Sequence, residues 1–349
     1  MNGRALIVGG GIAGLAAARG LLDRGWEVEV RERHPGPPDI GGALGMWPPA
    51  LEALDRLGLG ARVRATGSVP TAARLLASDG RSLARLDARA PSARLVARSA
   101  LLEILVGALP EGTVRWNTPV TAEEVASGTG TAGFAVVVGA DGLNGAVRRG
   151  AFPGAPSPRE LGTVAYRGAV PGHTGVFTET WGRGRVFGAT PMDGHATNWY
   201  AAVRADLAPD PRADPLPLLR RLYGGWHAGV VRVLDALPGT PVDRRTLYDL
   251  PALPSYVRGR HVLIGDSAHA MAPNLGRGAC ESLVDAAALA AALGEAPAVA
   301  AGLARYDRVR RRPAGRLVRA SRAMSGLATA TRLTGLRDGA LRTAGALLG

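Results

Sequence analysis

The chain has 349 residues and no lysine, so arginine supplies all 42 of its Lys+Arg charges. Cys280 is the only cysteine, which excludes an intrachain disulfide and a metal site built from several thiolates. None of the six histidines has a partner at metal-ligand spacing, so we expect no metal. No apolar run reaches the roughly 18 residues that a membrane-spanning helix needs. We therefore expect no membrane insertion and a cytoplasmic protein.

The positive charge is concentrated near the C-terminus. The formal net charge is +13 at pH 7, and the segment from Ala301 onward holds eleven arginines against two acids, Asp307 and Asp338. A basic surface of this kind can bind nucleic acid. However, an arginine-rich chain without lysine is also typical of a GC-rich genome, with the excess on a solvated helical face. We favour this interpretation and expect no nucleic-acid partner.

The periodicity predicts an α/β chain with two lobes. An apolar strand at 5–8, a helix at 15–23 and the strand WEVEVRER form a βαβ unit, and the apolar runs FAVVV and HVLI suit the same parallel sheet. Short alternating strands between 163 and 204, with a hairpin around Asp79-Gly80, predict an inserted antiparallel sheet. We expect further helices at 217–237 and after residue 300, the last one broken at Pro313.

The loop after the first strand carries the motif Gly9-x-Gly11-x-x-Gly14, with Ala13 inside it. The motif follows a strand and opens a helix, where its glycines permit a tight turn and the close approach of a pyrophosphate. Glu32 lies 18 residues beyond Gly14, at the end of the second strand, where its carboxylate can accept both hydroxyls of a ribose. The sequence therefore predicts a tightly bound FAD or NAD.

A second polar loop follows HVLI, in GDSAHAMAPNLGRGACESLVDA. Asp266 ends the strand and can hydrogen-bond a ribityl chain that leaves the pyrophosphate. Pro273, Gly276 and Gly278 then form a rigid loop with exposed N–H groups, and a helix begins near Ala279. These donors and the helix dipole would stabilise negative charge on a reduced flavin. The loop therefore favours FAD over NAD as the resident cofactor.

Three motifs resemble those of the class A flavoprotein monooxygenases, the para-hydroxybenzoate hydroxylase superfamily. The second loop is similar to the family's Gly-Asp motif, and VVVGADGLNGAVR is similar to its Asp-Gly motif at Asp141, Gly142 and Arg148. GALGMWPPALEALDRLGL and YDRVRRRP are similar to segments of the subgroup with FAD-dependent urate hydroxylase, 3-hydroxybenzoate 6-hydroxylase and zeaxanthin epoxidase. The resemblance covers nearly the whole chain.

The resemblance implies additional FAD contacts from Arg33, Arg98, Asp141 and the backbone of Val120. Together with the periodicity it implies a Rossmann-like FAD-binding lobe in three parts, an inserted antiparallel substrate lobe and a helical C-terminal region. The FAD-binding lobe takes 1–70, 93–158 and 253–300, the substrate lobe takes the hairpin 71–92 and 159–252, and the C-terminal region takes 301–349. In that last region we expect Tyr306, Val309, Leu317 and Ala320 to form one apolar face.

The chain departs from the family pattern at three places. Gly145 stands where the family usually has serine, so a side-chain hydrogen bond of the Asp-Gly motif should be missing, which weakens the expectation for NAD(P)H handling. Only 42 residues separate Arg98 from Asp141, so we expect a β-hairpin to be trimmed to AEEVASGTGTAG. Ser267 replaces a common alanine and is expected to be harmless.

The reaction implied by the resemblance consumes NADH or NADPH and O₂. Reduced FAD would form a C4a-hydroperoxide and insert one oxygen atom into an electron-rich aromatic or polycyclic small molecule, by hydroxylation or epoxidation. The flavin performs this chemistry, so no catalytic side chain is identified. We expect the substrate pocket between the inserted sheet and the flavin, lined by Trp47, Tyr166, Phe187 and Trp199, with Arg185 as an anion anchor.

Other functions differ in what they require. A flavin halogenase uses a catalytic lysine, which this chain lacks. A flavin-dependent dehydrogenase or reductase of the same fold, without oxygen insertion, stays open as the main alternative. A non-catalytic FAD-binding or arginine-tail interaction protein is a third possibility. The sequence is compatible with a monomer or a homodimer.

Overall fold

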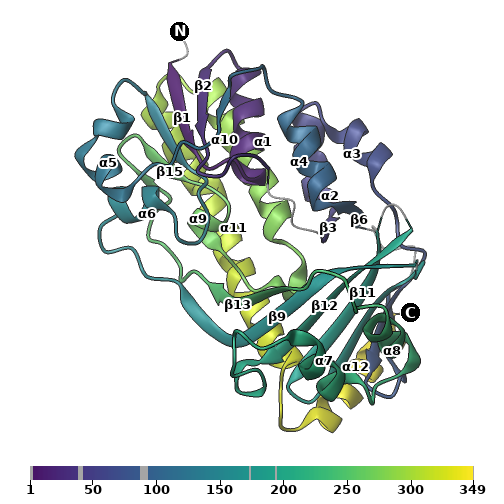
Figure 1. Cartoon of the computed structure of the whole chain (residues 1–349). Coiled ribbons are helices and arrows are strands. Elements are labelled where there is room, and N and C mark those ends of the chain that lie inside the picture. Colours follow the sequence, from purple (N-terminus) through teal and green to yellow (C-terminus); the bar gives the residue numbers. More distant parts are fainter. Residues whose placement is uncertain (1–2, 38–41, 87–92, 173, 193–194, 349) are drawn as a thin grey trace.

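The computed structural model describes residues 3–37, 42–86, 93–172, 174–192 and 195–348. Figure 1 shows an upper and a lower lobe, each built around a sheet, with one long helix that extends from the first lobe to the second. The upper sheet is mainly parallel and the lower one mainly antiparallel, so the predicted α/β class is confirmed.

In the described part of the chain, the upper sheet has six strands in the order β14-β15-β8-β1-β2-β7. They are β1 (Arg4–Val8), β2 (Glu27–Arg31), β7 (Val114–Arg115), β8 (Val136–Gly139), β14 (Val257–Arg258) and β15 (His261–Leu263). Their pairing is parallel except between β14 and β15. β1 and β8 are buried almost throughout, which explains their continuous apolar sequence.

Helices surround this sheet and close the upper lobe. They are α1 (Ile12–Leu22), α2 (Pro48–Arg56), α3 (Gly60–Thr66), α4 (Arg98–Val106), α5 (Ala122–Ser127), α6 (Ala146–Ala151), α9 (Asp266–His269) and α10 (Gly278–Glu295). β3 (Ala43–Met46) pairs with β6 (Arg94–Ala97) below them. α1 and α10 pack closely, because a Cβ at Gly20 would lie 2.7 Å from the Cβ of Ala290. The segment expected to keep a trimmed hairpin instead forms α5 and a 3₁₀ turn at Thr129–Thr131.

The lower sheet has seven described strands in the order β13-β9-β12-β11-β10-β4-β5. They are β4 (Ala73–Ala77), β5 (Ser82–Leu86), β9 (Arg159–Pro171), β10 (Phe177–Gly182), β11 (Arg185–Met192), β12 (Ala196–Arg204) and β13 (Asp243–Asp249). α7 (Pro215–Tyr223) and α8 (Ala228–Asp235) cover one face through a shared apolar core. The helix expected at 217–237 is therefore two helices, divided at Gly224 and Gly225.

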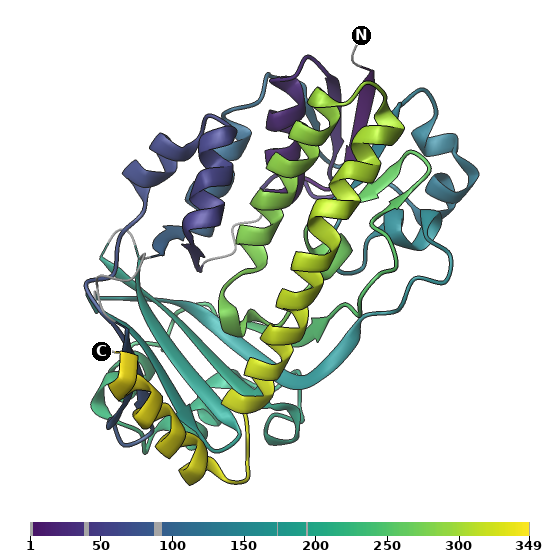
Figure 2. The same cartoon turned by 180° about the vertical axis from the view of Figure 1, so that it is seen from behind.

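The long helix α11 (Val299–Ala328) extends without a break from the upper lobe to the lower sheet, where α12 (Thr334–Leu348) follows (Figure 2). The predicted break at Pro313 is wrong, because Pro313 is exposed and buried residues such as Tyr306 and Ala314 hold the helix on both sides of it. The predicted apolar face is also wrong. Val309 is 46% exposed, while Arg310 is buried and takes part in an ion-pair network.

Candidate functional site

The glycine turn between β1 and α1 accepts only glycine at two positions. Gly9 has φ +108°, and a Cβ there would lie 2.4 Å from the Ala140 oxygen. A Cβ at Gly14 would lie 1.9 Å from the Gly9 oxygen, whereas one at Gly11 would meet no described atom within 4 Å. Among the described residues no side chain caps α1, so its first N–H groups are free. The open space and these donors fit a pyrophosphate.

Glu32 closes over this turn from the end of β2. Its Oε2 accepts a hydrogen bond from the Gly10 N–H at 2.6 Å, and its Oε1 accepts one from the His34 N–H at 2.9 Å. Arg33 is exposed beside it. The N–H of Thr118 donates to the Glu32 carbonyl, which brings the segment leading to Val120 alongside. The carboxylate thus lies where a ribose next to the pyrophosphate can take over the Gly10 bond.

The second loop lies directly beside the glycine turn. Gly265 has φ +56°, and a Cβ there would lie 3.0 Å from the Cβ of Ala13 in the first motif. Its N–H donates to Asp285 Oδ2 at 2.8 Å. Asp266 opens the short helix α9 at this point. The structure therefore brings the two loops together, although some 250 residues separate them in sequence.

The start of α10 is open in the way the sequence predicts. A 3₁₀ turn at Pro273–Leu275 leads into Gly276, which has φ +60°. No side chain among the described residues caps the helix, and a Cβ at Gly278 would meet no described atom within 4 Å. Ala279 follows in the first turn. Asn274 Oδ1 is buried without a partner in the described chain. The loop therefore has open space and free N–H donors that can bind a polar group of a ligand.

Arg98 interacts with both lobes. Its backbone N–H donates to the Gly42 carbonyl at 2.9 Å, and its side-chain Nε is buried with no partner among the described residues. Burial lowers the pKa of its guanidinium, and so does the charge of Arg167 on β9, while the charge of Asp266 opposes both. A half-buried guanidinium whose Nε is buried and lacks a partner among the described residues, beside Asp266, is suited to bind an acceptor of a cofactor.

Asp141, which follows β8, is held from two sides. Burial raises the pKa of its carboxyl group, which hydrogen bonds from the Val147 N–H and the Ser267 hydroxyl oppose. These bonds are 3.1 and 3.0 Å long. Ser267 Oγ also accepts from the Gly142 N–H at 2.8 Å, and Arg148 donates to the Ser267 carbonyl at 3.1 Å. The Asp-Gly motif and the second loop are thus joined through one serine.

Ser267 has a role that the sequence analysis missed. A Cβ at Gly145 would lie 2.2 Å from Asp141 Oδ1, so a serine would not fit at this position without a shift. The hydroxyl expected to be missing at residue 145 comes from Ser267 instead. The sequence contained the signal, because both departures from the family pattern lie in the two motifs that the structure joins.

A buried charge network fastens α9 and α10 to α11. His269 Nε2 lies 2.6 Å from Asp285 Oδ2, and Arg310 donates to Asp285 Oδ1 and to Glu281 Oε2, both at 2.6 Å. Burial raises the pKa of Asp285, but His269 and Arg310 outweigh it and hold that pKa at about 2. Burial lowers the pKa of His269, but Asp285 outweighs it and raises that pKa. His269 is therefore a structural residue that supports the second loop.

Four of the five residues predicted to line the substrate pocket lie on the face of the lower sheet that points away from the upper lobe. Tyr166, Phe187 and Trp199 are buried in the core between the sheet and α7 and α8, where Phe187 stacks on Trp199 at 5.9 Å. Arg185 faces the same layer, 5.7 Å from the Trp226 ring. Side chains alternate along a strand, so these residues face away from the upper lobe. The prediction for them was wrong.

The opposite face of the sheet presents polar groups to the upper lobe. Asn198, next to Trp199, accepts a hydrogen bond from the Ala43 N–H at 3.1 Å. Arg167, next to Tyr166, pairs with Asp243 at 2.8 Å and interacts with Arg98. Trp47, the fifth predicted residue, precedes α2, and its Nε1 would lie 3.7 Å from a Cβ at Gly276. Trp47 thus lies beside the second loop and stays a candidate.

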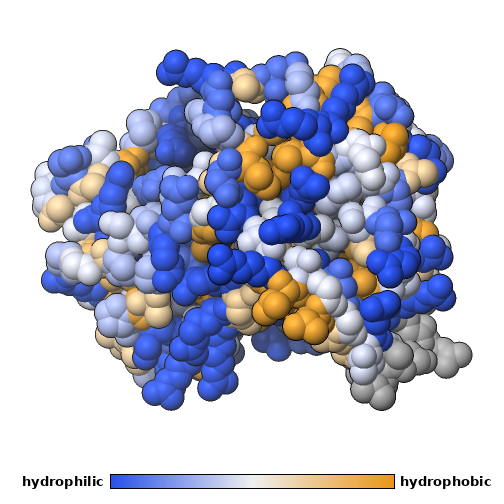
Figure 3. Space-filling view, turned by 90° about the horizontal axis from the view of Figure 1, so that it is seen from below, coloured by the Kyte–Doolittle hydropathy of each residue, from blue (hydrophilic) through white to orange (hydrophobic). Residues whose placement is uncertain are grey.

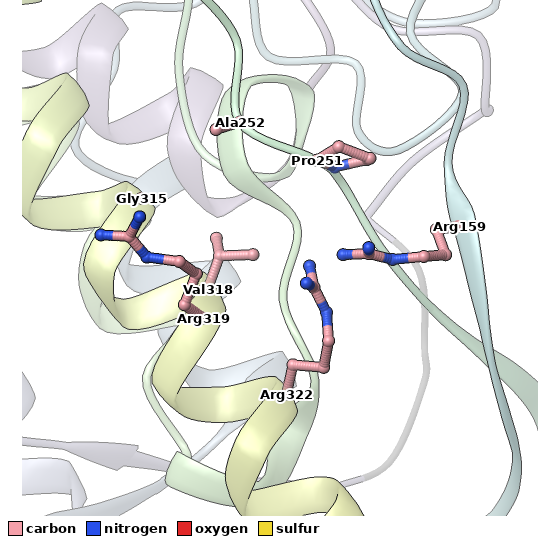
Figure 4. Close-up of a pocket in the computed structure, with 7 residues that line it drawn as sticks. All are labelled: Arg159, Pro251, Ala252, Gly315, Val318, Arg319 and Arg322. Atoms are coloured by element: carbon pink, nitrogen blue, oxygen red, sulfur yellow. The ribbon is translucent and has the colours of Figure 1, made fainter.

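A cavity of about 150 Å³ lies where α11 meets β9 (Figure 4). Its lining residues are Arg159, Pro251, Ala252, Gly315, Val318, Arg319 and Arg322. Arg159 and Arg322 point toward each other across it, and both bind the buried Asp249, at 3.1 and 2.5 Å. None of the predicted cofactor or substrate residues lines this cavity. It marks an ion-paired junction between β9 and α11.

The paired loops and the inserted sheet, together with the family model and relatives that are monooxygenases, show a class A FAD-dependent monooxygenase, as the motifs predicted. The chain belongs to the FAD binding domain family, whose model matches residues 3–321. The family model, an FAD binding domain over most of the chain, confirms FAD as the cofactor.

Three known proteins illustrate the similarity. Aurachin C monooxygenase/isomerase of Stigmatella aurantiaca is 32% identical over 325 residues, which cover 87% of this chain and 84% of that protein. The 2-heptyl-3-hydroxy-4(1H)-quinolone synthase of Mycobacteroides abscessus is 32% identical over 335 residues, covering 89% and 87%. The structure of Klebsiella pneumoniae HpxO with FAD and uric acid matches with a TM-score of 0.84 and 24% identity, covering 97% of this chain and 92% of that one.

Proposed function

We propose that this enzyme consumes NADH or NADPH and inserts one oxygen atom from O₂ into an electron-rich aromatic or polycyclic small molecule. The observation that carries the proposal is the contact between the two loops at Ala13 and Gly265, beside the polar face of the lower sheet. The relatives named as a monooxygenase and a quinolone synthase support the reaction class. The quinolone ring and heptyl chain in the second name favour a hydrophobic heteroaromatic substrate.

In this proposal, FAD lies across the two loops. Glu32 binds the adenosine ribose, with Arg33 and the Val120 backbone beside the adenine side. The N-terminus of α1 binds the pyrophosphate, and Asp266 and Arg98 bind the ribityl and phosphate groups. The full proposed set is Gly9, Gly11, Ala13, Gly14, Glu32, Arg33, Arg98, Val120, Asp141, Asp266, Pro273, Gly276, Gly278 and Ala279.

When bound, FAD supplies the redox chemistry with NAD(P)H and O₂. The chain's own groups bind and orient the cofactor and the substrate. The N–H donors of the second loop and the dipole of α10 would stabilise negative charge at the ring edge. Arg167, whose side chain is partly exposed on this face, presents a cation to a polar edge of the substrate. A phenolic or enolic substrate supplies its own electron push, so a protein base is not required.

The domain division follows from the same proposal. We assign the FAD-binding lobe to residues 1–70, 93–158 and 253–300, and the substrate lobe to 71–92 and 159–252, with 301–349 as the helical region. Residues 87–92 of the hairpin lie outside the part of the chain that the structure describes. The pairing of β4 with β10, from a distant part of the sequence, supports placing the hairpin in the substrate lobe.

The test is anaerobic mixing of the FAD-loaded protein with NADH or NADPH, with and without phenols and quinolones, followed by isotopically labelled O₂. We expect the substrate to accelerate flavin reduction and the product to carry one labelled oxygen atom. A product without the label would support the dehydrogenase or reductase alternative. If neither nucleotide reduces the flavin with any substrate, the proposed use of NAD(P)H is wrong.

A further inference from the structure

One face of α11 is a row of arginines. Arg305, Arg308, Arg312, Arg316 and Arg319 follow each other at spacings of three or four residues, which places them on one side of a helix, and all five are exposed. Arg305 pairs with Glu295 at 2.6 Å. Within the described part of the chain, no acid lies at ion-pair distance from the other four. Figure 2 shows α11 on the back of the molecule, uncovered along its length.

The arginine row ends in exposed leucines at the turn from α11 to α12. Leu327 continues the row on the same helix face and is 41% exposed, while Leu333 and Leu336 are 74% and 70% exposed. Leu333 adopts φ +55°, a left-handed conformation that is rare for a residue with a Cβ. Figure 3 shows apolar patches that interrupt the mostly hydrophilic surface on this underside. Both the exposure of the Leu333 side chain to water and its left-handed backbone conformation cost free energy in the isolated chain, so neither stabilises its fold.

We propose that these arginines and leucines form a docking surface for an anionic lipid membrane. Arginines bind headgroup phosphates while their stems lie along the interface, and leucines enter the boundary between headgroups and acyl chains. From Arg305 to Leu327 the row is about 33 Å long at about 1.5 Å per residue, a straight edge that suits a flat surface. In the described chain no helix is long and apolar enough to cross a bilayer, so the docking is peripheral.

The leucines distinguish a membrane from the other polyanions that an arginine row can bind. A nucleic acid offers phosphates and no apolar phase, so three exposed leucines would remain in water on binding it. A mixed lipid surface satisfies both kinds of side chain. This proposal goes beyond the oxygenase reaction, and its test measures vesicle binding without turnover. Docking would bring the enzyme to hydrophobic substrates dissolved in a membrane.

The test is co-sedimentation of the full-length, FAD-loaded protein with phosphatidylcholine vesicles, with or without phosphatidylglycerol. We expect binding to the anionic vesicles that weakens with salt, and little binding to phosphatidylcholine alone. Replacing Arg308, Arg312 and Arg316 together by glutamine should lower the partition coefficient roughly 100-fold, at about 1 kcal/mol for each arginine. Leu333→Ser with Leu336→Ser should lower it by roughly tenfold or more.

The matched control replaces three exposed arginines on α7 and α8, Arg220, Arg221 and Arg232, by glutamine. It changes the net charge equally and should leave binding within about twofold. Equal loss in the control and the α11 variant would overturn the proposal, because net charge alone would then explain binding. Wild-type protein that binds heparin or DNA but no vesicles would overturn it too. Flavin content and thermal unfolding verify that each variant is folded.

Discussion

Replacing Ser267 with alanine should loosen the junction between the Asp-Gly motif and the second loop. The buried Ser267 hydroxyl donates to Asp141 Oδ1 at 3.0 Å and accepts from the Gly142 N–H at 2.8 Å. Alanine removes both bonds and leaves their partners without this hydroxyl. A hydrogen bond to a carboxylate contributes about 1.5–3 kcal/mol and one between neutral groups about 1 kcal/mol. We therefore expect a loss of about 3 kcal/mol, and a further rise in the pKa of Asp141, which burial already raises.

The expected loss corresponds to a modest shift in melting temperature. For 349 residues that unfold as one unit, with about 2.1 cal/mol/K of unfolding entropy per residue, it amounts to about 4 °C. Calorimetry of the FAD-loaded and FAD-free proteins measures this shift. Ser321→Ala is the matched control, because among the described residues that buried hydroxyl donates only to the Met271 sulfur, at 3.7 Å, and its removal should shift the melting temperature by about 1 °C or less.

Two results would refute the reasoning. If Ser267→Ala and Ser321→Ala have the same melting temperature, the Ser267 hydroxyl does not hold the two motifs together. If Gly145→Ser restores the stability of the Ser267→Ala protein, the clash of 2.2 Å between a Cβ at residue 145 and Asp141 is not a real constraint.

Three more predictions concern the cofactor turn, the buried charges and the substrate face. Gly11→Ala should fold normally but lose FAD on gel filtration, since its Cβ would enter the space kept for the pyrophosphate; full flavin content would contradict this. The Asp285–His269 pair should stabilise the protein most between about pH 3.8 and 6.5. That stabilisation should be lost as the pH rises above about 6.5 through the raised pKa of His269, and as the pH falls below 3.8 toward the Asp285 pKa of about 2. Urea unfolding of Asp285→Asn should show neither pH dependence. Trp199→Ala should cost about 3–5 kcal/mol of stability, whereas Arg167→Ala, on the opposite face, should mainly raise the substrate KM; the reverse pattern would show that the face assignment is wrong.

The cofactor side of the site could be predicted from short segments. Its signals depend only on a few neighbouring residues, so they could be recognised without a structure. They are the positive φ of Gly9, the carboxylate of Glu32 at the end of the next strand and the uncapped helix start at Gly278. The substrate side could not. The alternation along β12 showed that Trp199 and Asn198 face opposite ways, but not which face α7 and α8 cover.

The sequence by itself determined the strand–turn–helix elements, the two nucleotide loops and the family, because each depends on local backbone conformation and residue spacing. Only the tertiary structure decided that Ser267 replaces the hydroxyl missing at Gly145, that Arg310 rather than Val309 lies on the inner face of α11, and that Trp199 is core. Each of these depends on which distant element packs against the residue. A side chain's surroundings are set by contacts across the fold, which residue spacing along one strand or helix does not specify.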